Sequence, residues 1–149
     1  MIELKIASSK QLPLFHAMEQ DADTSPYILP TTLEQHQQAF DHDDIIYLSI
    51  YENGEVAGYF ILALDADGSS VELRRIVVAR KGRGTGSSAI DALEAFCRDR
   101  LKRKRIWLDV FDFNARGRRV YARLGYRPFD QQDFEGKQLL FYEKSLGSG

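Results

Sequence analysis

Residues 76–87, with the sequence IVVARKGRGTGS, decide the fold of this chain. An apolar, β-branched run leads into three alternating glycines, Gly82, Gly84 and Gly86, and a helical pattern follows. Alternating glycines let the backbone turn tightly and come close to a ligand. The unpaired N–H groups of a helix's first turn lie at the positive end of its dipole. The stretch therefore predicts a phosphate-binding turn between a strand and a helix.

The hydrophobic period changes repeatedly on both sides of this turn. The expected strands are 3–6, 45–51, 56–64, 71–79, 106–111, 126–129 and 138–143. The expected helices are 12–18, 32–40, 84–101 and 114–124. Asn53-Gly54 predicts a hairpin turn, and Thr31 with Glu34 predicts a capping box ahead of the second helix. Antiparallel strands come first and one β-α-β crossover follows, so we expect an α+β (mixed α/β) fold with helices on both faces.

Length and composition are those of an ordinary globular domain. The 149 residues suit one domain over 1–146, with 147–149 as a linker or tag remnant. No apolar run approaches the ~20 residues of a membrane span, and no signal-peptide pattern is present. We therefore expect a cytoplasmic protein without membrane contact. The single Cys97 excludes an internal disulfide and lies on an apolar helix stripe, which predicts a buried structural thiol.

Charge is divided unevenly along the chain. Residues 1–73 hold 2 Lys+Arg and 13 Asp+Glu, a net charge of -11. Residues 74–149 hold 18 Lys+Arg and 9 Asp+Glu, a net charge of +9. A basic half favours an anionic partner and an acidic half a cationic one. Solvated helix faces of opposite sign would give the same distribution.

A nucleotide is one candidate ligand for the predicted phosphate-binding turn. No P-loop string occurs, but residues 84–89, GTGSSA, fit the dinucleotide pattern G-x-G-x-x-A, with Asp109 about 20 residues further on. A Rossmann-type fold needs repeated β-α-β units, however, and only one crossover is readable here. The antiparallel meander before the glycines also does not belong to that fold.

Two spaced motifs together resemble the GNAT superfamily of N-acetyltransferases. Residues 81–86, KGRGTG, are similar to its acetyl-CoA pyrophosphate loop, usually Q/R-x-x-G-x-G/A. Asn114, Gly117, Tyr121 and Gly125-Tyr126 match its second motif in order and spacing. Lys81 stands where Gln or Arg is usual, and Gly117 where Ala is usual. The resemblance covers residues 45–130 well and the first 44 only in outline.

The resemblance implies a GNAT-like, mostly antiparallel sheet of six to seven strands with about four helices, and acetyl-CoA as cosubstrate. The strand residues Ile76, Val77 and Val78 would pair with the pantetheine arm. Backbone N–H groups, with side chains of Lys81, Arg83, Thr85 and Ser87, would hold the pyrophosphate. The implied binding loop is Lys81, Gly82, Arg83, Gly84, Thr85, Gly86 and Ser87. Asn114 would bind near the thioester, and Tyr121 would protonate the leaving thiolate.

Glu72 is the candidate general base, directly or through water. It lies six residues before Val78, and even-numbered residues of that strand share one face unless a bulge intervenes. A surface glutamate paired with Arg74 or Arg75 fits the sequence equally well. The three histidines have no metal-ligand spacing, so no metal is expected.

The expected reaction is direct acetyl transfer from acetyl-CoA to a primary amine. The acceptor would be a small-molecule amine or a protein or peptide amine. The resemblance implies that residues 21–40 shape the acceptor site. Neither a membrane nor a nucleic acid partner is expected, and the protein would be a monomer or homodimer. The alternatives are a Rossmann-type nucleotide-binding protein and a non-catalytic module that binds acyl-CoA or nucleic acid.

Overall fold

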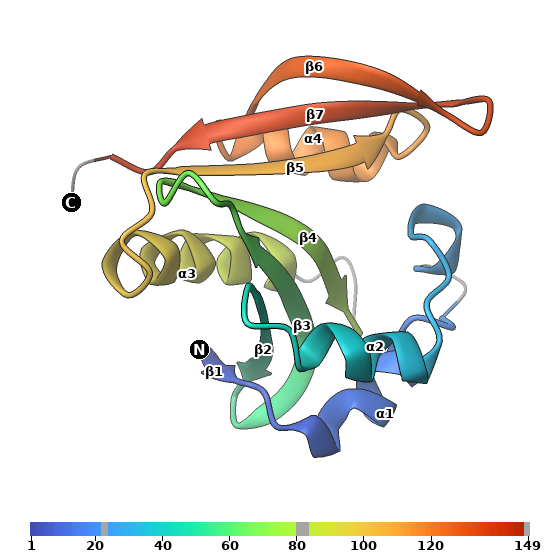
Figure 1. Ribbon diagram of the computed structural model, residues 1–149, viewed down its shortest axis with the longest axis vertical. Coiled ribbons are helices and arrows are strands. Elements are labelled where there is room, and N and C mark those ends of the chain that lie inside the picture. The colour runs from blue at the N-terminus through green and yellow to red at the C-terminus, as the bar shows by residue number, and fades with distance from the viewer. Residues whose placement is uncertain (22–23, 80–83, 148–149) are drawn as a thin grey trace.

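The computed structural model describes residues 1–21, 24–79 and 84–147. Its centre is a seven-stranded sheet in the order β1-β2-β3-β4-β5-β7-β6 (Figure 1). The strands are β1 (Ile2–Ile6), β2 (Ile45–Glu52), β3 (Glu55–Leu64), β4 (Ser70–Val78), β5 (Arg105–Phe111), β6 (Arg127–Phe134) and β7 (Lys137–Ser145). Neighbouring strands pair antiparallel except for β4 and β5, which are parallel.

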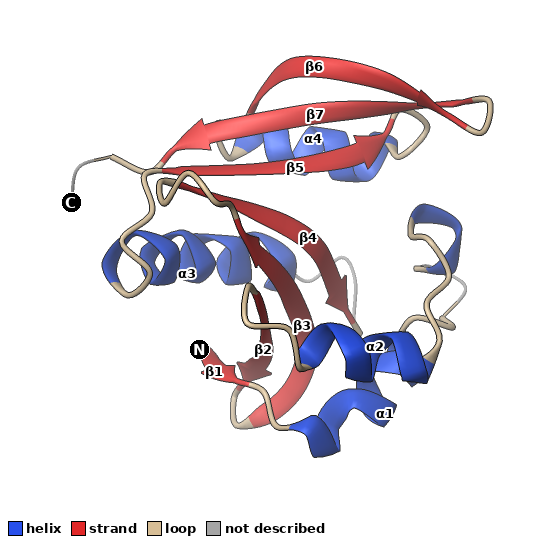
Figure 2. Ribbon diagram, viewed as in Figure 1, coloured by secondary structure: helices blue, strands red, loops and turns tan. Residues whose placement is uncertain are grey.

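Helices cover both faces of this sheet (Figure 2). The α-helices are α1 (Leu12–Met18), α2 (Leu33–Phe40), α3 (Thr85–Asp99) and α4 (Ala115–Arg123). Two short 3-10 helices lie at Ser9–Gln11 and Ser25–Tyr27. The expected α+β fold, with its mostly antiparallel sheet and helices on both faces, is confirmed. None of the described helices is long and apolar enough to cross a membrane.

Each face of the sheet has its own apolar core. On one face, Ile90 and Leu93 of α3 pack with strand residues such as Leu62 and Val71, and all four are almost fully buried. Cys97 belongs to this core, so its expected burial is confirmed, and burial raises the pKa of its thiol to about 12. On the other face, α1 buries Phe15 against strands β2 and β3.

Local signals located most element boundaries to within two residues. Asn53 and Gly54 have φ of 53° and 87°, as a two-residue hairpin turn between β2 and β3 requires. The capping box of α2 is formed one residue later than expected. Thr32 accepts from the backbone N–H of Gln35, and the Gln35 side chain accepts from that of Thr32. The pattern S/T-x-x-E/Q fits both registers, so the motif alone could not choose between them.

Strand β6 extends well beyond the expected 126–129. It runs to Phe134 and forms a hairpin with β7 through the turn at Glu135 and Gly136. Its middle residues, 130–133, are DQQD and exposed. An edge strand with no buried face shows no hydrophobic alternation, so periodicity missed its second half.

The feature that positions the site is the separation of β4 from β5. The two strands pair over three residues only, from Ser70–Arg105 to Glu72–Trp107. Beyond that point β4 stays paired with β3 as far as Val78, and β5 stays paired with β7 as far as Phe111. The strands therefore diverge, as Figure 1 shows, and beyond Glu72 no described strand pairs with this edge of β4.

A bulge accompanies the divergence. Ile61 of β3 is opposite Arg75 and Leu62 is opposite Leu73, so Arg74 is the extra residue of β4. At the far end of this pair, a Cβ on Gly58 would lie 2.1 Å from the carbonyl oxygen of Val77. Only glycine permits this close approach, which holds the end of β4 against β3.

Candidate active site

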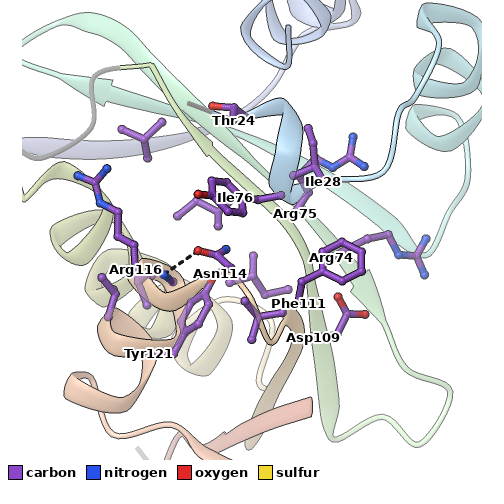
Figure 3. A pocket seen from close by; sticks show the side chains of 18 of the residues that line it. Thr24, Ile28, Arg74, Arg75, Ile76, Asp109, Phe111, Asn114, Arg116 and Tyr121 are labelled. Carbon is purple, nitrogen blue, oxygen red and sulfur yellow. Dashed lines mark hydrogen bonds between the residues drawn. The ribbon is translucent and has the colours of Figure 1, made fainter. Parts of the chain in front are cut away.

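A pocket of about 1270 Å³ opens where β4 and β5 diverge. Its lining comes from the ends of β4 and β5, the start of α3, helix α4 and residues 24–31 between α1 and α2. The side chains labelled in Figure 3 gather around this one space. The chain thus brings together both predicted motifs and the segment that was expected to shape the acceptor site.

The first turn of α3 presents unpaired backbone donors to this pocket. Gly84 is the N-cap with φ of 76°, a left-handed conformation that favours glycine. Ser88 is the first residue whose N–H bonds within the helix, to Gly84 O at 3.1 Å. The N–H groups of residues 85–87 precede it and remain as donors for an anion. The predicted loop residues Lys81, Gly82 and Arg83 lie outside the described residues.

Thr85 lines the pocket, but its hydroxyl already has a partner within the protein. It donates to Glu52 Oε2 at 2.9 Å, and the Thr85 side chain is buried beneath the turn. Ser87 does line the pocket, where its hydroxyl accepts from Arg123 at 3.0 Å. With Arg116 and Arg119 of α4, Arg123 gives this end of the pocket a positive wall.

Asn114 and Gly117 form the N-terminal turn of α4. Asn114 Oδ1 accepts from the backbone N–H of Gly117 at 2.9 Å, so its amide oxygen is used in the cap (Figure 3). A Cβ at position 117 would lie 2.8 Å from Asn114 Nδ2. The glycine that departs from the usual alanine therefore makes room for the asparagine side chain. Asn114 lines the pocket, and its role toward the thioester stays a prediction.

Tyr121 is the buried aromatic residue on the pocket side of α4. Its ring contacts Tyr126 edge-on, with centroids 5.8 Å apart. Burial, and secondarily the charge of Asp109, raise the pKa of Tyr121 to about 12. The phenol is therefore protonated at neutral pH. Within the described part of the chain its hydroxyl makes no hydrogen bond, so its proton is available to a ligand.

Glu72 lies at the point of divergence but not on the expected face. Val71, Leu73 and, after the bulge, Ile76 pack toward α3, whereas Glu72 lies on the opposite face. The alignment of Glu72 with Ile76 and Val78 was expected only without a bulge, and a bulge with Arg74 as the extra residue places Glu72 on the other face. Glu72 still lines the pocket and forms an ion pair with Arg74 at 3.1 Å.

The electrostatics around Glu72 favour its protonated form more than in water. Burial raises its pKa, the adjacent Arg74 opposes this, and the charges of Asp109 and Asp65 add to the increase. A carboxylate with a raised pKa is a better proton acceptor at neutral pH than an ordinary one. Both interpretations of the sequence hold in part: Glu72 is paired with Arg74, and it faces the pocket.

These features can be compared with known proteins. The model of the Acetyltransferase (GNAT) family matches residues 12–126. The chain belongs to this family.

A probable spermine N(1)-acetyltransferase of Bacillus subtilis subsp. natto is 27% identical over 104 residues, which cover 64% of this chain and 68% of that protein. The solved spermidine N-acetyltransferase of Vibrio cholerae with CoA and spermine superposes with a TM-score of 0.83 at 13% identity, covering 97% of this chain and 95% of that one. The solved aminoglycoside acetyltransferase in complex with coenzyme A superposes with a TM-score of 0.81 at 16% identity, covering 97% of this chain and 95% of that one. These structures confirm the GNAT fold.

Two functional features of this acetyltransferase were missed in the sequence. Asp109 was noted only within the dinucleotide pattern, yet its side chain is exposed at the pocket. Desolvation by the pocket wall raises the pKa of Asp109, and the positive charge of Arg74 lowers it by a smaller amount. An alternating strand pattern would have put Asp109 opposite the core residues Leu108 and Val110, but nothing in the sequence reveals that β4 turns away there.

The second missed feature attaches the pocket wall to the sheet. Arg75 donates to Leu29 O at 2.8 Å, to Thr31 Oγ1 at 3.0 Å and to Glu19 Oε2 at 2.7 Å. Glu19 is 3% exposed and also accepts from Tyr59, while His36 Nε2 lies 2.9 Å from the same carboxylate oxygen. Residues 24–31 are thereby held against the pocket, which most of them line.

Proposed function

We propose that this acetyltransferase transfers the acetyl group of acetyl-CoA to a primary amine by direct attack. The observation that carries the proposal is the edge of β4 from Leu73 to Val77, which no described strand covers, at the base of a pocket that ends on the first turn of α3. An unpaired strand edge offers alternating N–H and C=O groups, which suit the amides of a pantetheine arm. A free N-terminal turn suits a pyrophosphate.

The cosubstrate would lie along residues of both motifs. The backbone of Ile76, Val77 and Val78 would bind the pantetheine arm, although the Val77 side chain itself is buried in the opposite core. The N–H groups of Gly84–Ser87 would hold the pyrophosphate, together with the predicted Lys81, Gly82 and Arg83. The guanidinium groups of α4 would neutralise the remaining phosphate charge.

The chemistry needs a base, an oxyanion donor and an acid. The acceptor arrives as an ammonium and gives one proton to Glu72, directly or through water. The neutral nitrogen attacks the thioester carbonyl, and the oxyanion that forms accepts from a β4 N–H near Val78. The C–S bond then breaks, and the leaving thiolate takes a proton from Tyr121. The nitrogen loses its second proton as the amide forms, and this proton returns Tyr121 to the phenol through water. Glu72 and Tyr121 would be the catalytic residues, with no metal involved.

Cosubstrate binding can be tested by thermal shift. A Cβ on Gly86 would meet only Val78 Cγ2 at 3.9 Å, so Gly86→Val should fold while obstructing the phosphate approach. We expect acetyl-CoA to raise the melting temperature of the wild type, with no shift in Gly86→Val and none with NAD. Stabilisation by NAD but not by acetyl-CoA would contradict the proposal and favour the Rossmann-type alternative.

The base can be tested through the pH dependence of kcat/KM. Glu72→Gln keeps the size of the side chain and its contact with Arg74 but cannot accept a proton. We expect the low-pH limb to move or disappear and the rate to recover partly at high pH, where more of the amine is neutral. An unchanged pH profile would show that Glu72 is not the base and serves only as the ion-pair partner of Arg74.

The remaining expectations concern the protein's context. We propose a cytoplasmic enzyme that acts as a monomer or homodimer, on a small-molecule or peptide amine, without a membrane or nucleic acid partner.

A further inference from the structure

Exposed apolar side chains gather at the acceptor end of the pocket. Tyr27, Leu29 and Phe113 are 41%, 47% and 44% exposed, and they are three of the seven large apolar side chains that are exposed in the described part of the chain. Tyr27 stacks on Phe113 with centroids 5.9 Å apart, and Phe113 stacks on Phe111 at 5.1 Å.

This aromatic group bridges two distant parts of the chain. Tyr27 ends the 3-10 helix between α1 and α2, whereas Phe113 belongs to the turn between β5 and α4. Tyr27, Leu29 and Phe111 line the pocket directly. Leaving such rings in water is unfavourable, and a group of them beside a concave site is typical of a surface that a ligand covers.

The charges at this end are nearly balanced before any acceptor binds. The charged residues here are Glu72, Arg74, Arg75 and Asp109. Arg74 is paired with Glu72 at 3.1 Å, and Arg75 with the buried Glu19 at 2.7 Å. Within the described residues, Asp109 is the carboxylate at this end that has no ion-pair partner.

This balance fits an acceptor with one positive charge. A single ammonium group would be complementary to Asp109 and could pass its proton to the adjacent Glu72. A linear polyamine carries several charges along its length, and here its further charges would find no second unpaired carboxylate among the described residues that line this end. A charge placed in a binding site without a partner counts against that acceptor.

We propose that the acceptor is a small primary amine with a single positive charge and an apolar body of aromatic size. Tyr27 and Phe113 bind the apolar body, and Asp109 faces the ammonium group. The inference rests on the proposed function and narrows its substrate class, away from the polyamines in the names of the relatives.

The wild-type enzyme is tested first with three amines, 2-phenylethylamine, ethylamine and spermidine, with release of free CoA as the readout. Removing one methylene from a substrate in an apolar pocket costs about 10–200-fold in kcat/KM. Loss of a whole ring should cost at least about tenfold, so 2-phenylethylamine should exceed ethylamine by that factor. It should also exceed spermidine.

Two variants then locate the preference. Tyr27→Ser and Phe113→Ser each remove an exposed ring, so both should fold with little change in melting temperature. We expect each to lose most of the advantage of 2-phenylethylamine over ethylamine while the KM for acetyl-CoA stays the same. Phe129→Ser is the matched control, because Phe129 is 43% exposed and lines a separate pocket near Trp107. It should keep the full preference.

The outcomes separate the two proposals. Turnover that favours spermidine, or variants that slow both monoamines equally, would overturn the aromatic acceptor and leave acetyl transfer intact. CoA release with none of the amines, together with no thermal shift by acetyl-CoA, would overturn both.

Discussion

Arg75→Leu should destabilise the protein strongly because it leaves a buried carboxylate without its guanidinium partner. The side chains of Arg75 and Glu19 are 11% and 3% exposed, so solvent screens their interaction little. Removing one member of a buried ion pair costs about 3–5 kcal/mol. For a domain of this size 1 kcal/mol corresponds to about 2–4 °C, so the melting temperature should fall by about 6–20 °C.

The effect should depend on pH in a defined direction. Burial alone would raise the pKa of Glu19, but hydrogen bonds from His36 and Tyr59 and the charge of Arg75 outweigh it and hold the pKa below the ordinary 4.5. A lowered pKa in the folded state stabilises the fold above pH 4.5, and this stability is lost as the pH falls through the folded-state value. The deficit of Arg75→Leu should thus be largest near neutral pH and shrink in acid.

Urea unfolding at pH 7 and at about pH 4 measures both effects. The matched control is Arg98→Leu, which removes a surface partner of the exposed Asp99 and should cost almost nothing. The double variant Glu19→Leu with Arg75→Leu should be more stable than Arg75→Leu alone, because no carboxylate is then left buried. A deficit below about 1 kcal/mol at pH 7, or one that is equal at both pH values, would refute this account.

Three further variants test other parts of the structure. Tyr121→Phe should lower kcat by roughly 10²–10⁴-fold and leave acetyl-CoA affinity unchanged, and equal turnover in stopped assays would assign the ring to packing alone. Asp109→Asn should lower activity toward an amine acceptor and change the melting temperature little, because the side chain is exposed to solvent; a large loss of stability in thermal unfolding would assign Asp109 a structural role. Gly58→Ala should cost at least about 1–3 kcal/mol in denaturant titration, because its Cβ would meet Val77 O at 2.1 Å; a stable variant would show that β3 and β4 can separate freely.

Local chemistry explains what could be predicted from the sequence. Asn53-Gly54 and the glycines at 84 and 86 impose backbone conformations through nearest neighbours, so their turns are readable without tertiary contacts. The two GNAT motifs likewise lie on short continuous stretches. The face of Glu72 could not be decided from the sequence, because a bulge depends on the partner strand and no residue type marks Arg74 as the extra one.

The position of residues 24–31 as a wall of the pocket could not be predicted from sequence patterns, for a different reason. Glu19 and Arg75 are 56 residues apart, and each looks like an ordinary surface charge in its own segment. Tyr27 and Phe113 are separated by a still longer stretch, and their contact exists only because the segment between α1 and α2 meets the turn between β5 and α4 beside the pocket. Pairings of this kind come from the folded topology and leave no periodic signal.

The free edge of β4 also has a consequence for the behaviour of the chain in a crowded solution. Exposed strand edges are templates on which other chains add strands and aggregate. This edge lies inside the sheet, between β3 and β5 in the strand order, and is not one of the two outer edges formed by β1 and β6. The pocket that separates β4 from β5 is bounded by helices α3 and α4 and by residues 24–31. The divergence thereby opens part of the β4 backbone to a bound molecule without adding a third outer edge to the sheet.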